Sequence, residues 1–337
     1  MKKLGQLWFG FYILFCWNPL FADAALLKEK KTQQFMNQMV QQYHFNRTEL
    51  ASVLRQAQYQ PQIIESMEKP YEKKTWDVYR SIFLTPERLK AGLEFWKNNR
   101  QTLAQAEKQY GVPAPVIVAI IGVETLYGKH QGQYRVLDAL TTLAFYYPKR
   151  SDFFTKELKE YLLLCREHAV SPTEYKGSYA GAMGKPQFMP SSYRFYAVDS
   201  TGKGHANLMQ DDQDVIGSVA NYFHRHGWKM HELVAEPVNL QGTRYKTLQM
   251  NAKHADYEYL RLVRAGIKPL GHPSHRPNKA GLIELTTNSG QAYWMAYPNF
   301  YVITRYNTSP QYALVVHLLA MQLQNLWVNL QGNQSGA

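Results

Sequence analysis

The spacing of apolar residues predicts helices over most of the chain. Over residues 26–60, apolar side chains recur at steps of three and four, which is typical of amphipathic helices. Thr85-Pro86-Glu87 is typical of a helix N-terminus, because Thr caps helices and Pro suits their first turn. We expect that helix to run to Tyr110 and to end at Gly111. Further helices fit residues 136–146, 150–168, 212–226 and 309–328.

Residues 233–305 have a different composition, rich in Thr, Tyr, Val, Gly and Pro. Apolar and polar residues alternate over 282–285 and again over 301–304, and such alternation predicts strands. We interpret this part as a small strand-rich insertion, whereas the Gly-rich segment 176–193 is expected to be irregular. The fold class is therefore α+β, mainly α.

Residues 114–127 form the most apolar helix expected after the N-terminal segment, and they contain one carboxylate, Glu124. Ile117, Ile121 and Glu124 fall on one face. A carboxylate on a buried face is costly unless it is protonated, paired or at the edge of a cleft, and desolvation raises its pKa. A raised pKa suits a general acid, so Glu124 is a candidate catalytic group. The alternative is a structural glutamate that pairs with an arginine or caps a loop.

The N-terminus is typical of an export signal. Lys2 and Lys3 precede an apolar run, and small residues suitable for cleavage follow near Ala24. A lipoprotein would need Cys16 to be acylated, but Phe15 stands where a small residue is expected, so we expect a periplasmic protein without a lipid anchor. After cleavage only Cys165 remains, which excludes an intramolecular disulfide.

The formal net charge of +12 indicates attraction to polyanions. Peptidoglycan, nucleic acid and anionic lipid all fit, and a basic solvated surface is the simplest explanation. No nucleic-acid-binding motif is recognisable, so no nucleic-acid partner is expected. The 11 histidines form no H-E-x-x-H motif, which argues against a zinc peptidase.

Four blocks in the sequence resemble the membrane-bound lytic murein transglycosylase B family. They comprise residues 121–125 with 135–140, 176–184 with 187–193, 217–223, and 298–301 with 304–307. The resemblance spans about residues 75–330 and implies a lysozyme-like catalytic core with a helical domain and a small β-rich insertion. The expected domains are a signal peptide (1–24), a helical domain (25–110), the catalytic core with an EF-hand-like loop (111–232), the β-rich domain (233–297) and a return to the core or helical domain (298–330).

The resemblance also implies a reaction. Family members cut the β-1,4 bond between N-acetylmuramic acid (MurNAc) and N-acetylglucosamine (GlcNAc) without water, and the muramyl C6 hydroxyl closes on C1 to give a 1,6-anhydro end. Standard glycosidases need two carboxylates, whereas here Glu124 would act first as acid and then as base. Asp138 could be a second carboxylate, but we expect it to cap a helix or pair with an arginine.

Several other positions match site residues of the family. Ser178 would bond Glu124 or the substrate acetamido group, and Gln187 would line the sugar subsites. Tyrosines would frame the cleft, although core packing is the alternative for each. The full set of expected substrate-binding residues is Tyr79, Lys149, Arg150, Ser178, Gln187, Tyr222, Asn299, Tyr301 and Tyr306.

Residues 199–207 resemble an EF-hand calcium loop. Asp199, Thr201 and His205 occupy ligand positions, and Asp214 aligns with the terminal ligand after a one-residue insertion. Lys203 stands where the family has Asp, and an ammonium cannot ligate calcium. We therefore expect the loop fold without a required cofactor, with Lys203 replacing the ion by pairing with Asp199 or Asp214.

Two other functions compete with a transglycosylase that acts as a monomer on peptidoglycan strands. A hydrolytic muramidase of the same fold would release reducing ends. A non-catalytic peptidoglycan-binding or scaffold protein would not need Glu124. Cell-wall synthesis proteins are candidate partners.

Overall fold

The computed structural model describes residues 26–68 and 74–335, so the expected signal peptide lies outside the described residues. Backbone contacts divide the chain into two compact units, one ending at Tyr59 and the other beginning at Gln60. The first unit contains α2 (Lys30–Tyr43) and α3 (Arg47–Arg55). Asn46 caps α3, because its side chain accepts hydrogen bonds from the backbone N–H groups of residues 48 and 49.

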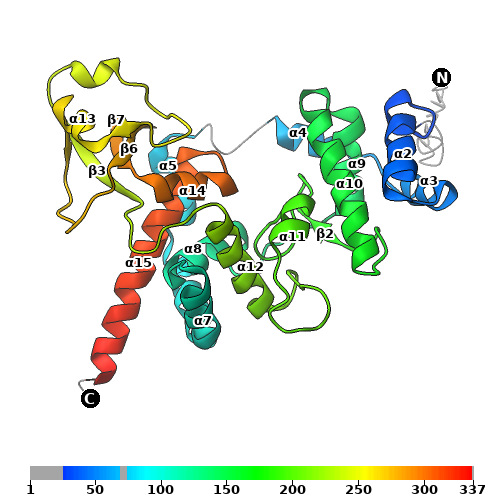
Figure 1. Cartoon of the computed structure of the whole chain (residues 1–337), viewed down its shortest axis with the longest axis horizontal. Coiled ribbons are helices and arrows are strands. Elements are labelled where there is room, and N and C mark those ends of the chain that lie inside the picture. Colours follow the sequence, from blue (N-terminus) through cyan, green and yellow to red (C-terminus); the bar gives the residue numbers. More distant parts are fainter. Residues whose placement is uncertain (1–25, 69–73, 336–337) are drawn as a thin grey trace, which may run out of the picture. The chain divides into compact units, whose positions relative to one another are not determined.

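The second unit has a helical part built around α8 (Ala114–Thr125), which packs against α15 (Pro310–Ser335), α6 (Pro86–Asn98), α7 (Arg100–Tyr110) and α12 (Asp212–Arg225) (Figure 1). The expected helical domain of 25–110 is thus divided, since its last four helices, α4 to α7, belong to the second unit. The remaining helices and short strands of this part are α4 (Pro61–Met67), α5 (Trp76–Phe83), β1 (Tyr134–Arg135), α9 (Val136–Tyr146), η2 (Pro148–Arg150), α10 (Ser151–Glu167), β2 (Lys176–Gly177), α11 (Pro190–Tyr196) and α14 (Pro298–Tyr306).

Two expectations about local structure are wrong. The helix expected to run from residue 86 to 110 is interrupted at Asn99, whose side chain instead donates to the carbonyl of Phe95. Residues 301–304, expected as a strand, lie in α14. Pro298 occupies the first turn of that helix, and Phe300, Tyr301 and Ile303 are buried, so helix initiation and packing outweigh the β-propensity of the segment.

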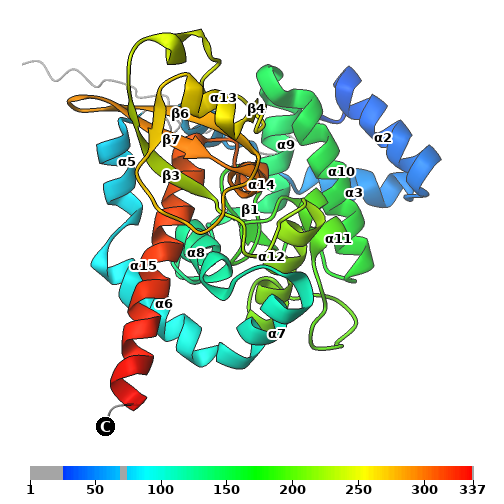
Figure 2. The same cartoon turned by 60° about the vertical axis from the view of Figure 1, so that its left-hand side comes forward.

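The predicted strand-rich part is confirmed as a five-stranded antiparallel sheet in the order β4-β6-β7-β3-β5. Figure 2 shows its strands together with the short helix α13. Leu262, Leu282, Met295 and Tyr297 are buried in its own hydrophobic core. The elements are β3 (Ala235–Leu240), η3 (Arg244–Thr247), β4 (Tyr257–Glu258), α13 (Tyr259–Arg264), β5 (Ile267–Pro269), β6 (Lys279–Thr287) and β7 (Gly290–Ala296).

Helix α15 closes the second unit and extends beyond the expected end at residue 328. Its stretch Pro310–Gly332 is long and apolar enough to cross a membrane. However, eight of its residues between Tyr312 and Leu323 are buried, and the helix packs against α8, α6 and α5. Its first half is therefore a core helix of this unit.

Candidate active site

Glu124 lies in the last turn of α8, a helix that is buried on nearly every side. The residue itself is partly exposed. Burial raises the pKa of its carboxyl to about 7, although a hydrogen bond from Tyr312 opposes the shift. A carboxyl with this pKa holds a proton on roughly half of the molecules at neutral pH, so it can both donate and accept one.

The hydroxyl of Tyr312 donates to Glu124 Oε1 at 2.5 Å. Tyr312 is buried in the first turn of α15, whose first half packs along α8. Burial, followed by the charge of Glu124, raises the pKa of Tyr312 well above its ordinary value, so it stays a donor. Tyr312 was absent from the sequence prediction. The only available signal was a polar pair, Gln311 and Tyr312, at the start of an otherwise apolar helix.

The backbone at the end of α8 turns sharply, which leaves Glu124 at the helix terminus. Leu126 and Tyr127 have positive φ values of 50° and 59°. Gly122 permits this turn, because a Cβ atom there would lie 2.4 Å from the Tyr127 hydroxyl oxygen. The Thr125 hydroxyl donates to the carbonyl of Lys185 at 2.7 Å and so ties the terminus of α8 to the irregular segment that follows β2.

An aromatic cluster lies beside Glu124. The Tyr306 ring stacks on that of Tyr312 at 6.4 Å and packs edge-on against Tyr222 at 4.9 Å. Burial, and next the Glu124 charge, raise the pKa of Tyr306. The hydroxyl of Tyr306 donates to the carbonyl of Pro186, and that of Tyr222 to the carbonyl of Arg305. Tyr79 is buried and adds to the raised pKa of Tyr312, so these tyrosines gather around the glutamate.

Ser178 and Gln187 line one pocket of about 510 Å³, together with Tyr134 and Tyr179. The Gln187 amide donates to the carbonyls of Gln131 and Gly184, at 3.1 and 2.9 Å. The Ser178 hydroxyl accepts from the backbone N–H groups of residues 180 and 182, at 3.2 and 3.1 Å. Ser178 therefore shapes its own loop as well as facing the pocket.

Four other expected substrate-binding residues make contacts within the protein. Asn299 has 0% exposure, and its amide bonds the backbone of residues 229 and 232, so it holds a loop in place. Tyr301 packs against β6, where a Cβ on Gly281 would lie 1.9 Å from its hydroxyl. Lys149 pairs with Glu68 at 2.7 Å, and the Arg150 guanidinium lies 4.3 Å from the centre of the Phe153 ring.

The carboxylates at the expected calcium-ligand positions are hydrogen-bonded within the protein. Asp199 accepts from the backbone N–H groups of residues 203 and 204, and buried Asp214 accepts from those of residues 200 and 207. Lys203 pairs with Asp211 at 3.0 Å, and not with Asp199 or Asp214 as expected. The His205 ring stacks near His168 at 4.5 Å. Across the described residues, no cluster of three or more His, Cys, Asp or Glu side chains could hold a metal.

Asp138, the other carboxylate considered from the sequence, is buried in the first turn of α9. Both of its oxygens accept hydrogen bonds from the guanidinium of Arg135, each at 2.8 Å. Such a two-pronged pair fixes the position of a carboxylate. The arrangement agrees with the structural role expected for Asp138.

The family model for the transglycosylase SLT domain matches residues 28–321. Membrane-bound lytic murein transglycosylase B of Escherichia coli is 42% identical over 294 residues, which cover 84% of this chain and 80% of the relative. Soluble lytic transglycosylase SltB1 of Pseudomonas aeruginosa is 43% identical, with a TM-score of 0.81 over 87% of this chain and 98% of that one.

A more distant solved structure is that of SltB3 from the same organism, in complex with NAG-anhNAM-pentapeptide. It is 26% identical, with a TM-score of 0.74 over 87% of this chain and 79% of that one. The lysozyme-like fold class and the resemblance inferred from the four blocks are confirmed. The chain is an enzyme that belongs to the transglycosylase SLT domain family of lytic murein transglycosylases.

Proposed function

We propose that this lytic transglycosylase cuts the β-1,4 bond between MurNAc and GlcNAc in peptidoglycan and leaves a 1,6-anhydro-MurNAc end. The observation that carries the proposal is Glu124, partly exposed at the end of α8, with a pKa raised by burial to about 7. Among the described residues, the hydrogen-bond partner of its side chain is a tyrosine hydroxyl and not a cation. The relative crystallised with NAG-anhNAM-pentapeptide supports the same product for this chain.

In this proposal Glu124 acts twice. The protonated carboxyl donates to the glycosidic oxygen as the bond to C1 breaks. The carboxylate formed then removes the proton from the muramyl C6 hydroxyl as its oxygen bonds to C1, which restores the acid. The raised pKa makes both transfers accessible near neutral pH. The Tyr312 hydroxyl holds Oε1 and leaves the other carboxyl oxygen for the substrate.

The products distinguish this reaction from hydrolysis. Digestion of purified sacculi should release fragments lighter by one water than those of a hydrolytic muramidase, as measured by mass spectrometry. Glu124→Gln should reduce their release about 1000-fold, because a general acid/base contributes roughly 100- to 10,000-fold. Glu94→Gln, on the exposed side of α6, is the matched control. Reducing ends without anhydro ends would support the hydrolase instead, and unchanged release by Glu124→Gln would support a non-catalytic role.

We also propose a periplasmic location after removal of residues 1–24, with no metal required for activity. The E. coli relative is named membrane-bound, so the location of this chain needs its own test. Cell fractionation with mass spectrometry of the mature N-terminus would separate a cleaved periplasmic form, beginning near residue 25, from a protein acylated at Cys16. Pull-down from cross-linked cells would test for partners among cell-wall synthesis proteins, and light scattering would test the expected monomer.

A further inference from the structure

The side chain of Arg88, on α6, joins the ends of two other helices. Its Nε donates to the carbonyl of Gly122, in the last turn of α8, at 2.9 Å. One of its terminal nitrogens, Nη1, donates to the carbonyls of Ile82 and Phe83, at the end of α5, at 2.9 and 2.7 Å. The last carbonyls of a helix lie at the negative end of its dipole, so a cation is favourable there. One guanidinium therefore holds two helix C-termini together.

Arg88 makes these contacts without an anionic partner. The residue is half-buried and forms no salt bridge with a carboxylate of the residues that the structure describes. The adjacent carboxylate, that of Glu87, pairs instead with Lys129 at 3.4 Å. Burial lowers the pKa of Arg88, because desolvation disfavours its charged form. The hydrogen bonds to the two helix ends are thus the contacts that keep this cation in place.

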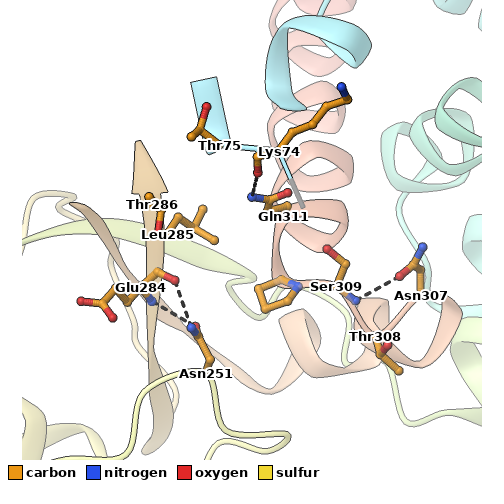
Figure 3. A pocket seen from close by; sticks show the side chains of 11 residues that line it. Lys74, Thr75, Asn251, Glu284, Leu285, Thr286, Asn307, Thr308, Ser309 and Gln311 are labelled. Atoms are coloured by element: carbon orange, nitrogen blue, oxygen red, sulfur yellow. Dashed lines mark hydrogen bonds between the residues drawn. The ribbon is translucent and has the colours of Figure 1, made fainter. Parts of the chain in front are cut away.

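The helices that Arg88 joins also meet at the catalytic pair. The end of α8 carries Glu124, and the start of α15 carries its donor Tyr312. The Gln311 amide, next to Tyr312, donates to the carbonyl of Lys74, just before α5, at 2.9 Å (Figure 3). Helix α5 is therefore tied to α15 at its start and to α8 at its end, and the Glu124–Tyr312 bond closes the ring.

The backbone that follows Glu124 needs such outside contacts. Leu126 and Tyr127 both have positive φ values, at 50° and 59°. Two consecutive non-glycine residues in the left-handed region are unfavourable, and they persist only where the surroundings hold them. The Thr125 hydroxyl ties this terminus to the segment that follows β2, and Arg88 ties it to α5.

We propose that Arg88 is a positioning residue, which keeps the Glu124 carboxyl within hydrogen-bond distance of the Tyr312 hydroxyl by fixing the end of α8 to the end of α5. The proposal rests on the proposed function, because it concerns the group that transfers the proton. With the end of α8 released, the bond from Tyr312 weakens and the carboxyl is less well aimed at the glycosidic oxygen. Proton transfer then slows, whereas binding of the glycan strand is retained.

The test uses two variants of the full-length mature enzyme, with soluble glycan strands as the substrate. Arg88→Lys keeps the charge but lacks the planar fork that reaches both helix ends. Arg88→Gln removes a desolvated cation that has no anionic partner, so folding should be retained. Each substitution is also made together with Tyr312→Phe. Arg276→Lys, at a half-buried arginine paired with Glu236 in the sheet, is the matched control.

We expect both Arg88 variants to lower kcat per folded molecule about tenfold at pH 7, with KM changed less than twofold, because a small misplacement of a catalytic group slows the chemical step. The Tyr312 bond lowers the pKa of Glu124, so weakening it should move the basic limb of the pH–rate profile upwards. In the Tyr312→Phe background the same substitutions should move the limb no further. Arg276→Lys should lower the melting temperature and leave the limb unmoved.

Two results would overturn the role of Arg88. One is a loss of stability with unchanged kcat and an unmoved limb, which indicates a structural role only. The other is a shift of equal size with and without the Tyr312 hydroxyl, which means that Arg88 does not act through that bond. Reducing ends in place of anhydro ends would instead overturn the proposed function, and the pH–rate comparison would still test Arg88 on those products.

Discussion

Two glutamates in this molecule have opposite pKa shifts, although burial desolvates both carboxyls and a tyrosine hydroxyl donates to each. Glu124 ends helix α8, and burial raises the pKa of its carboxyl to about 7. Glu236, in strand β3, is 6% exposed. Burial would raise the pKa of Glu236 too, but hydrogen bonds from Arg276 and Tyr297 outweigh it and the pKa is lowered.

The difference lies in the partners. Arg276 donates to both oxygens of Glu236, at 2.7 and 3.0 Å, and the backbone N–H of Gly271 donates to one of them at 3.2 Å. Glu124 instead accepts a hydrogen bond from the hydroxyl of Tyr312. A desolvated carboxylate with a cation stays ionised and holds structure together, whereas one with only a hydroxyl can exchange a proton. Burial alone therefore does not distinguish a catalytic from a structural glutamate.

The largest expected loss of stability comes from removing Arg276, the cation that pairs with the structural glutamate Glu236. Arg276→Ala leaves Glu236 buried with only Tyr297 and a backbone N–H as donors, and should destabilise the protein by about 3 kcal/mol. Denaturant unfolding measures this. The lowered pKa means that the pair stabilises the protein above about pH 4.5 and that this stability is lost as the pH falls through the pKa in the folded protein. If Arg276→Ala and the unmodified protein have the same free energy of unfolding at pH 7, the cation beside Glu236 does not stabilise the fold.

The next expected change in the free energy of unfolding comes from replacing the catalytic glutamate, and it is a gain in stability. The Glu124 pKa of about 7 lies above its ordinary value of 4.5, so the folded state binds the proton more tightly than the unfolded state. The free energy of unfolding should therefore fall as the pH rises from about 4.5 to about 7. Glu124→Gln, a neutral side chain of the same shape, should be more stable than the unmodified protein by up to about 3 kcal/mol at pH 8 and equally stable at pH 4. A constant difference across that range would contradict the raised pKa.

The sequence revealed one of these two glutamates and not the other. Glu124 stands out because it is the single carboxylate in an apolar helix, and that pattern is local. Tyr312, which lies 188 residues away, reaches Glu124 only through the packing of α15 on α8. Glu236 gave no signal, because its cation lies 40 residues further along the chain across a loop that the sequence does not place.

For the fold as well, local features were predictable from the sequence and long-range contacts were not. The apolar helices and the strand-rich insertion follow from local periodicity, and their presence was foreseen. The domain boundary expected at residue 110 differs from the observed division between residues 59 and 60, because amphipathic helices such as α6 and α7 suit either domain and only their contacts with α8 show which core they join. Asn299 illustrates the same limit: its family block was recognised, but the block does not show whether a side chain faces the cleft or holds a loop.

Removing the hydroxyl that donates to Glu124 tests how far this hydrogen bond sets the pKa of the carboxyl. The Tyr312 bond lowers the pKa of Glu124, so Tyr312→Phe should move it above about 7. The basic limb of the pH–rate profile should shift upwards, and activity at pH 7 should fall about tenfold as the carboxyl loses its orientation. Tyr297→Phe, at the corresponding bond in the sheet, is the control and should leave the profile unchanged. A fall in activity without a shift of the profile would assign Tyr312 a packing role only.

The smallest expected effect is a change in melting temperature at the EF-hand-like loop, where a carboxylate pairs with a surface lysine. Lys203 pairs with Asp211 beside Asp199 in the EF-hand-like loop, and we propose that its ammonium takes the place of a calcium ion. The unmodified protein should then unfold at the same temperature in 1 mM calcium and in chelator. Lys203→Asp restores an oxygen ligand at the fifth loop position, where calcium loops carry one.

Binding to the folded state alone raises stability by mass action, so calcium should raise the melting temperature of Lys203→Asp by a few degrees, about 2–4 °C. Lys229→Asp makes the same charge change at a similarly exposed lysine outside the loop, and it should show no response to calcium. A calcium response of the unmodified protein would show that Lys203 does not replace the ion. A Lys203→Asp variant that ignores calcium would show that Asp199 and Asp214 are committed to the backbone N–H groups they now accept from, and that the loop has lost more than one ligand.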